Sequence, residues 1–178
     1  MNYIDYYDLE NYLLNTVRNR FIKEGKLSAF DFFCIIIWKA NRAKSNIARR
    51  LLKCGYSSLE EAVSALTREL AQAVTPKDKM NCLHKWGFML PMSSAILTIL
   101  YPDDFTIYDY RVCDMLGDCH KLTNITSFEK LWLGYNDFKE KVESKCPSGL
   151  SLRDKDRYLW GKSFYEDLTK DISNRFAK

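Results

Sequence analysis

Residues 76–116, PKDKMNCLHKWGFMLPMSSAILTILYPDDFTIYDYRVCDML, hold the pattern that decides the fold. Pro76 suits the first turn of a helix because its φ is fixed and it has no N–H to satisfy, and Gly87 suits the end of that helix. After a short turn, the apolar run SSAILTILY predicts a second helix that Pro102 closes. FTIYDY is expected to be extended, and a short helix is expected from Tyr110 to Leu116.

Helical patterns also dominate the rest of the chain. Gly25 ends the first expected helix, Ser28 suits the cap of the second, and Ser57 or Ser58 caps the third. These three helices are expected over 5–23, from about 30 into the low fifties, and over 59–74. Two more are expected over 127–144 and 151–174. The chain of 178 residues fits one all-α domain with two lobes.

Composition excludes several classes of protein. The chain is 47% hydrophobic and 28% charged, which indicates a globular core, and its net charge of +4 does not by itself favour a nucleic-acid partner. The 6 cysteines form no CxxC pair, and MNYIDYYDLE does not resemble a signal peptide, so we expect reduced thiols in a cytosol. No run reaches the length of about 20 apolar residues that a membrane span needs. No metal is expected, the Cys113, Cys119 and His120 cluster being the one weak exception.

The distribution of charge is more informative than its sum. The stretch from Trp38 to Lys53 contains no acidic residue. One helical face there carries polar and basic residues at steps of three or four: Lys39, Arg42, Asn46, Arg49 and Lys53. The opposite face carries Ala40, Ala43, Ile47 and Leu51 and suits a core contact. Either an ordinary solvated face or a nucleic-acid contact explains this pattern.

The hairpin stretch resembles a known family. WGFMLPMSSAIL is similar to the hairpin of the helix-hairpin-helix DNA glycosylases, GVGPKTASAIL, with Gly87 at the first glycine and Met89 at the second. Downstream, FTIYDYRV resembles the family's FPVDTHVxRV segment, whose catalytic aspartate aligns with Asp109. The interval from Pro91 to Asp109 is also close to that of the family. The resemblance implies a compact two-lobed helical bundle over residues 1–178.

Two further segments extend the resemblance, which places the helix-hairpin-helix element at about 77–100. FDFFCIIIWKANRAKSNIARRLL resembles the family's apolar helix, its SQQT-type turn and the following helix, with Ala40 in the turn where the usual Gln pair is missing. LRDKDRYLWGKSF resembles a closing helix of small bacterial members. The implied DNA contacts are Lys39, Asn41, Arg42, Lys44, Lys85, Gly87, Phe88, Met89, Ser93, Ser94 and Arg111.

Two departures from the family pattern narrow the expected chemistry. Met89 replaces the second hairpin glycine, so the phosphate-binding turn must be remodelled. Pro91 stands where lyase-type members carry a Schiff-base lysine, and proline has no amine that can form the imine. Lys85 precedes the turn and is expected to contact phosphate. The family's iron–sulfur cysteines have no counterpart here, so no cofactor is expected.

Asp109 has three interpretations. It directly precedes YRVCDMLG and can be a helix N-cap, or it can pair with Arg111. The resemblance implies instead that it stabilises the positive charge that develops on the sugar as an N-glycosidic bond breaks. The cap and the catalytic role are compatible, because a helix N-terminus stabilises an ionised carboxylate.

Removing a base also requires a pocket that holds it outside the stack. The chain contains 10 Phe, 11 Tyr and 4 Trp, so aromatic residues for such a pocket are abundant, although each singly also suits a core. The candidates for the pocket or its rim are Trp38, Trp86, Tyr108, Trp160 and Phe164.

The sequence therefore predicts a monofunctional DNA glycosylase that flips a damaged or modified base and leaves an abasic site. The expected partner is double-stranded DNA, bound by a monomer in the bacterial cytosol, in repair or in defence against phage DNA. A DNA-binding protein with a glycosylase-like fold, or an all-α protein unrelated to DNA, are the alternatives. The excised base stays open among oxidised purines, alkylated bases and hypermodified phage bases.

Overall fold

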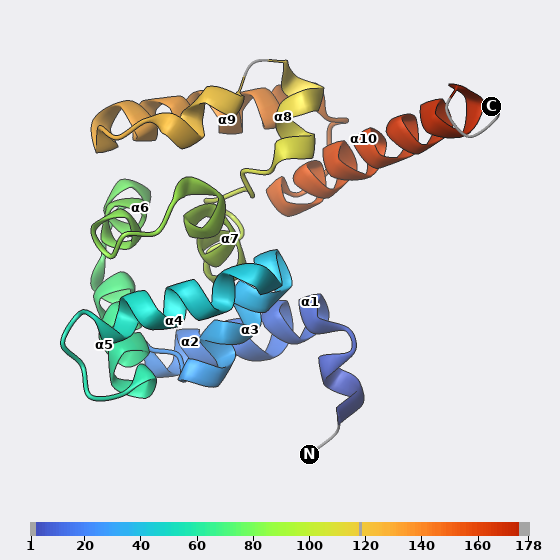
Figure 1. Ribbon diagram of the computed structural model, residues 1–178. Helices are drawn as coiled ribbons and strands as arrows, with labels where there is room; N and C mark the ends of the chain where they lie inside the picture. The colour runs from blue at the N-terminus through green and yellow to red at the C-terminus, as the bar shows by residue number, and fades with distance from the viewer. Residues whose placement is uncertain (1–2, 118, 175–178) are drawn as a thin grey trace. The chain divides into compact units, whose positions relative to one another are not determined.

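The structure is a computed structural model that describes residues 3–117 and 119–174 (Figure 1). Within those residues every regular element is a helix, so the expected all-α fold is confirmed. The chain divides into two compact units, Met1–Tyr101 and Pro102–Lys178, here called the N-terminal and the C-terminal unit. None of the described helices is both long and apolar enough to cross a membrane.

The N-terminal unit is built around its last helix. Its elements are η1 (Tyr3–Tyr6), α1 (Leu9–Asn11), the π-helical η2 (Tyr12–Val17), α2 (Arg18–Glu24), α3 (Ala29–Ala40), η3 (Asn41–Ala43), α4 (Lys44–Leu52), α5 (Leu59–Gln72), α6 (Pro76–Lys85) and α7 (Leu90–Leu100). Every residue of α7 from Met92 to Leu100 is buried, as expected for a helix that is apolar on all sides. It packs against α3 and α6.

The expected long second helix is interrupted, which corrects the sequence prediction. α3 begins after Ser28, whose Oγ accepts a hydrogen bond from the Asp31 N–H at 3.1 Å. It ends at Ala40, which adopts φ −159° and ψ 85°, and a 3₁₀ turn leads into α4. No residue from 39 to 46 is buried. A continuous helix there would bury no apolar face, and most helical stability in proteins comes from such packing.

The break divides the expected core face as well. Ile47 and Leu51 of α4 are buried, whereas Ala40 is exposed. The interruption falls where the family resemblance places a turn. Asn41 and Arg42 are thereby carried on a short exposed segment between two helices.

The C-terminal unit has an aromatic core. Its helices are α8 (Tyr110–Leu116), the 3₁₀ helix η4 (His120–Asn124), α9 (Phe128–Lys145) and α10 (Leu152–Asn174). Residues 105–108 have no regular structure and are buried. The ring of Phe105 stacks on Tyr135 of α9 at 6.2 Å between centroids, and Tyr108 lies 5.1 Å from Phe138. The segment that leads into Asp109 is thus held against α9.

Candidate functional site

The turn between α6 and α7 is tight and closed by backbone hydrogen bonds. Gly87 adopts φ +79°, which favours glycine, and its N–H donates to the His84 carbonyl at 2.9 Å. The Phe88 N–H donates to the Leu83 carbonyl at 3.0 Å, as in a Schellman ending. α7 begins at Leu90, earlier than the expected start near Ser93.

Three of the residues that were expected to contact DNA are buried beneath the hairpin. Phe88 is buried and its ring lies 6.0 Å from that of Phe32. Ser93 and Ser94 are also buried, and their hydroxyls donate to the Phe88 and Pro91 carbonyls. These side chains face the core of the N-terminal unit and not the solvent.

Other implied contacts lie on the surface. The side chain of Met89 is 59% exposed, and Lys85, the last residue of α6, is exposed. Asn41, Arg42 and Lys44 are exposed around the 3₁₀ turn, where the Lys44 ammonium donates to Asn41 Oδ1 at 2.9 Å. Lys39 is half-buried at the end of α3.

A basic pocket on α4 is joined to the hairpin. The pocket has a volume of about 300 Å³ and is lined by Asn46, Arg49, Arg50 and Lys53. The Arg50 guanidinium donates to the Gly87 carbonyl, which ties α4 to the hairpin turn. Arg50 was not among the implied DNA contacts, and sequence periodicity placed it off the basic face. A helical-wheel argument misses it because its side chain turns toward the hairpin.

Asp109 is the N-cap of α8, as its position before YRVCDMLG predicts. Its Oδ1 accepts a hydrogen bond from the Arg111 N–H at 3.1 Å, and the residue is partly exposed. The Arg111 guanidinium forms an ion pair with Asp167 Oδ2 at 2.7 Å. The backbone of Arg111 therefore orients Asp109, while its side chain extends to α10.

Two candidate pocket residues form an aromatic ledge with Arg111. The rings of Trp160 and Phe164 stack at 5.7 Å with 7° between their planes, and both are nearly half exposed. The guanidinium carbon of Arg111 lies 5.6 Å from the Trp160 centroid and 5.9 Å from that of Phe164. The C-terminal unit thus links the predicted site residues Asp109, Arg111, Trp160 and Phe164.

Two of the three remaining aromatic candidates, Trp86 and Tyr108, are held by named structural contacts. Trp86 stacks on Tyr56 at 5.9 Å, and its Nε1–H donates to Glu69 Oε2 at 2.7 Å. Tyr108 is buried, and its hydroxyl donates to the Cys119 carbonyl at 2.6 Å. Trp38 is half-buried on α3. Trp38 and Trp86 belong to the N-terminal unit, and Tyr108 belongs to the core of the C-terminal unit.

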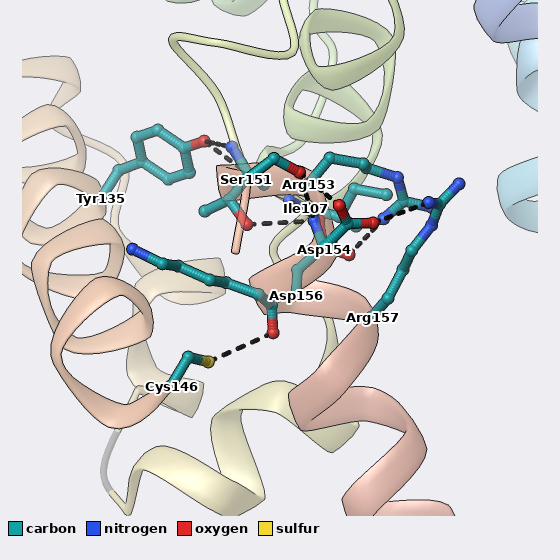
Figure 2. A network of polar contacts seen from close by, with 10 residues as sticks. Ile107, Tyr135, Cys146, Ser151, Arg153, Asp154, Asp156 and Arg157 are labelled. Atoms are coloured by element: carbon teal, nitrogen blue, oxygen red, sulfur yellow. Dashed lines mark hydrogen bonds and ion pairs between the residues drawn. The ribbon is translucent and has the colours of Figure 1, made fainter. Parts of the chain in front are cut away.

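Figure 2 shows a network of polar contacts, and the sequence did not reveal its buried part. Tyr135 accepts from the Thr106 N–H at 3.0 Å and donates to the Thr106 carbonyl at 2.7 Å. Asp156 of α10 accepts from the Thr106 hydroxyl and the Ile107 N–H, both at 3.2 Å, and pairs with Arg153. The segment before Asp109 is therefore held by a phenol from α9 and a carboxylate from α10. Only the spacing of Arg153 and Asp156 hinted at the network, and such i,i+3 pairs are common on exposed helices.

Burial changes the acidity of this network. Asp156 is 3% exposed, and loss of solvation raises the pKa of its carboxyl to about 6 from 3.8. The charge of Arg153 and the hydrogen bonds from Ile107 and Thr106 oppose this rise but do not cancel it. The carboxyl of Asp156 therefore loses its proton at a higher pH than the carboxyl of an exposed aspartate.

We expect this carboxyl to make the stability depend on pH. Because its pKa is raised, the folded protein keeps a proton that the unfolded chain has already released. Its contribution is complete below pH about 4 and is lost as the pH rises through about 6. Relative to Asp156→Asn, the free energy of unfolding of the native protein should fall by roughly 2–3 kcal/mol across that interval. Urea unfolding of both proteins at a series of pH values measures this difference. If the free energies of unfolding of the two proteins change in parallel with pH, the prediction is wrong.

Metal-binding residues do not converge in the described part of the chain. No group of three or more His, Cys, Asp or Glu side chains that could hold an ion occurs among residues 3–117 and 119–174. His120 Nε2 lies 2.9 Å from Asp114 Oδ1, and burial raises the pKa of the Cys113 thiol to about 12. Such a thiol is a poor metal ligand, because the thiolate is the binding form.

No protein-family model, no curated protein and no solved structure matches this chain.

Proposed function

We propose that the protein is a monofunctional DNA glycosylase that flips a damaged or modified base and hydrolyses its N-glycosidic bond, leaving an abasic site. The observation that carries the proposal is the position of Asp109. It caps α8 at the end of a buried segment anchored by Tyr135 and Asp156, and Arg111 connects it to the Trp160–Phe164 ledge.

Asp109 supplies the charge that this chemistry needs. As the bond to the base breaks, positive charge develops on the sugar, and a carboxylate held in one orientation stabilises it without reorganising. The same carboxylate orients the water that attacks the sugar. Pro91 provides no amine at the hairpin position, so the reaction ends in hydrolysis and not in strand cleavage through an imine.

The N-terminal unit supplies the contacts to DNA in this proposal. The exposed cations of α4, Asn41 and Arg42 on the 3₁₀ turn, and the hairpin surface at Met89 face solvent. The cations of α4 and Arg42 neutralise phosphates without reading sequence, and the Asn41 amide can donate to a phosphate oxygen. The enzyme would act as a monomer on double-stranded DNA in a bacterial cytosol, in base-excision repair or in defence against modified phage DNA.

Mass spectrometry of free bases released from varied DNAs tests the proposal. The panel includes duplexes with oxidised or alkylated bases and naturally modified phage genomes. Release of one base, with an alkali-sensitive abasic site left behind, is the expected result. If the protein binds duplex DNA but releases no base from any of these DNAs, the glycosylase assignment is wrong.

That outcome would favour a second candidate, a DNA-binding protein without catalysis. Met89 in place of a hairpin glycine and the absence of a Gln pair in the 3₁₀ turn favour this candidate. Tight, salt-sensitive binding to duplex DNA without abasic product distinguishes it from the enzyme.

The aromatic ledge yields a prediction on substrate binding. Trp160→Ala removes a stacking surface, and stacking is worth about 1–3 kcal/mol per base, so kcat/KM for base release should fall roughly 5- to 150-fold. Tyr165→Ala is the matched control, because Tyr165 is an exposed aromatic residue of the same helix. If both variants have the same kcat/KM for base release, the Trp160–Phe164 ledge is not part of the base pocket.

A further inference from the structure

We infer that the α4 pocket lined by Asn46, Arg49, Arg50 and Lys53 binds backbone phosphates of duplex DNA, in place of the first turn of α7. The inference rests on the proposed function, which makes DNA the partner, and it specifies where the backbone is held.

The first turn of α7 is a poor phosphate site. A helix N-terminus binds phosphate through N–H groups that have no partner within the helix. Here Pro91 has no N–H, and the Met92 N–H donates to the Met89 carbonyl at 3.0 Å. The Ser93 N–H donates to the same carbonyl at 2.9 Å. The exposed Met89 side chain also offers an anion no hydrogen bond.

The α4 pocket has what that turn lacks. Its guanidinium and ammonium groups lie on the exposed side of one helix, and Arg50 is held beside the turn by its bond to the Gly87 carbonyl. Arg49 is also positioned: its NH2 group donates to Asn46 Oδ1 at 2.6 Å and its Nε to the Ser45 carbonyl at 3.3 Å. A guanidinium has five N–H donors, so donors remain for phosphate oxygens.

The stretch of chain that carries the pocket residues has charges of one sign. No acidic residue occurs in the sequence between Asp31 and Glu60, although solvated helical faces usually mix both signs. Cations in the last turn of a helix also stabilise its carbonyls, which accounts for Arg49 and Arg50 singly. This stabilisation of the helix end does not account for a pocket in which the cations converge beside a hairpin turn.

Salt-dependent binding tests the site. The double variant Arg49→Gln/Lys53→Gln leaves the Arg50–Gly87 bond in place, and both replaced residues are exposed, so the fold should be retained. Affinity for a short unmodified DNA duplex is measured between about 50 and 200 mM salt. The slope of log K against log salt should become shallower by about 1 to 2. The affinity of the double variant should be at least roughly tenfold lower than that of the native protein. The control Lys23→Gln/Arg68→Gln removes two exposed charges from α2 and α5.

The outcomes separate this inference from the proposed function. If the double variant binds with the same affinity and slope as the control, the pocket does not hold the backbone, whatever the catalytic result. If base release fails in the native protein while the double variant loses affinity and slope, the pocket stands and only the glycosylase assignment falls. If the control loses affinity and slope by the same amount, the effect comes from the overall charge of the protein, and the pocket has no specific role.

Discussion

Asp109→Asn should lose base release by a factor of about a thousand or more, while duplex binding and the fold stay unchanged. In the proposed mechanism the carboxylate stabilises the developing cation, so its removal should cost several kcal/mol of transition-state stabilisation. About 1.4 kcal/mol corresponds to a factor of ten in rate. Asn caps helices about as well as Asp, so its side-chain oxygen can still accept the Arg111 N–H bond. The substitution therefore separates catalysis from the capping of α8.

Single-turnover release of free base is the measurement, with alkali cleavage of abasic sites as a second readout. Asp114→Asn is the matched control, because Asp114 is an exposed carboxylate of the same helix. It should release base at the native rate. Undiminished product from Asp109→Asn would leave Asp109 with its capping role alone.

Asp156→Ala should lower the free energy of unfolding at neutral pH by about 3–5 kcal/mol. Removing one partner of a buried ion pair leaves the other charge uncompensated, and the Arg153 side chain is only 10% exposed. The Ile107 N–H and the Thr106 hydroxyl lose their acceptor as well. Base release should fall with stability, because the same segment carries Asp109.

The neighbouring exposed ion pair provides the control for this effect. Asp154 and Arg157 also pair at i,i+3 on α10, at 2.9 Å, but both are more than 40% exposed. Asp154→Ala should cost at most about 1 kcal/mol. Chemical denaturation followed by tryptophan fluorescence measures both variants, since Trp132 and Trp160 lie in the C-terminal unit. Equal losses for the two variants would show that burial does not decide the strength of the pair.

Restoring an apolar pair distinguishes the ion pair from mere packing. In Arg153→Met/Asp156→Leu no charge is left buried, so much of the stability lost in Asp156→Ala should return. The hydrogen bonds to Thr106 and Ile107 stay lost, and base release should remain impaired. This split between stability and activity is expected only if Asp156 positions the segment before Asp109.

Local sequence signals predicted most helix boundaries. The short helix Tyr110–Leu116 has the predicted bounds, and Ser28, Ser58 and Asp109 are N-caps, because capping depends on side chains a few residues away. The continuous helix through Ala40 was wrong, since periodicity alone does not show whether the solvated stretch has packing to support it.

The sequence by itself determined the helical class, the capping role of Asp109 and the basic character of α4, because each follows from residue type and spacing along the chain. Only the tertiary structure decided which aromatic residues face solvent, that Arg50 reaches Gly87, and that Asp156 and Tyr135 hold the segment before Asp109. These contacts join residues roughly 30 to 50 positions apart, where hydrophobic periodicity carries no information on pairing. The reason is physical: the burial that raises the pKa of Asp156 arises only when α10 packs on the C-terminal core.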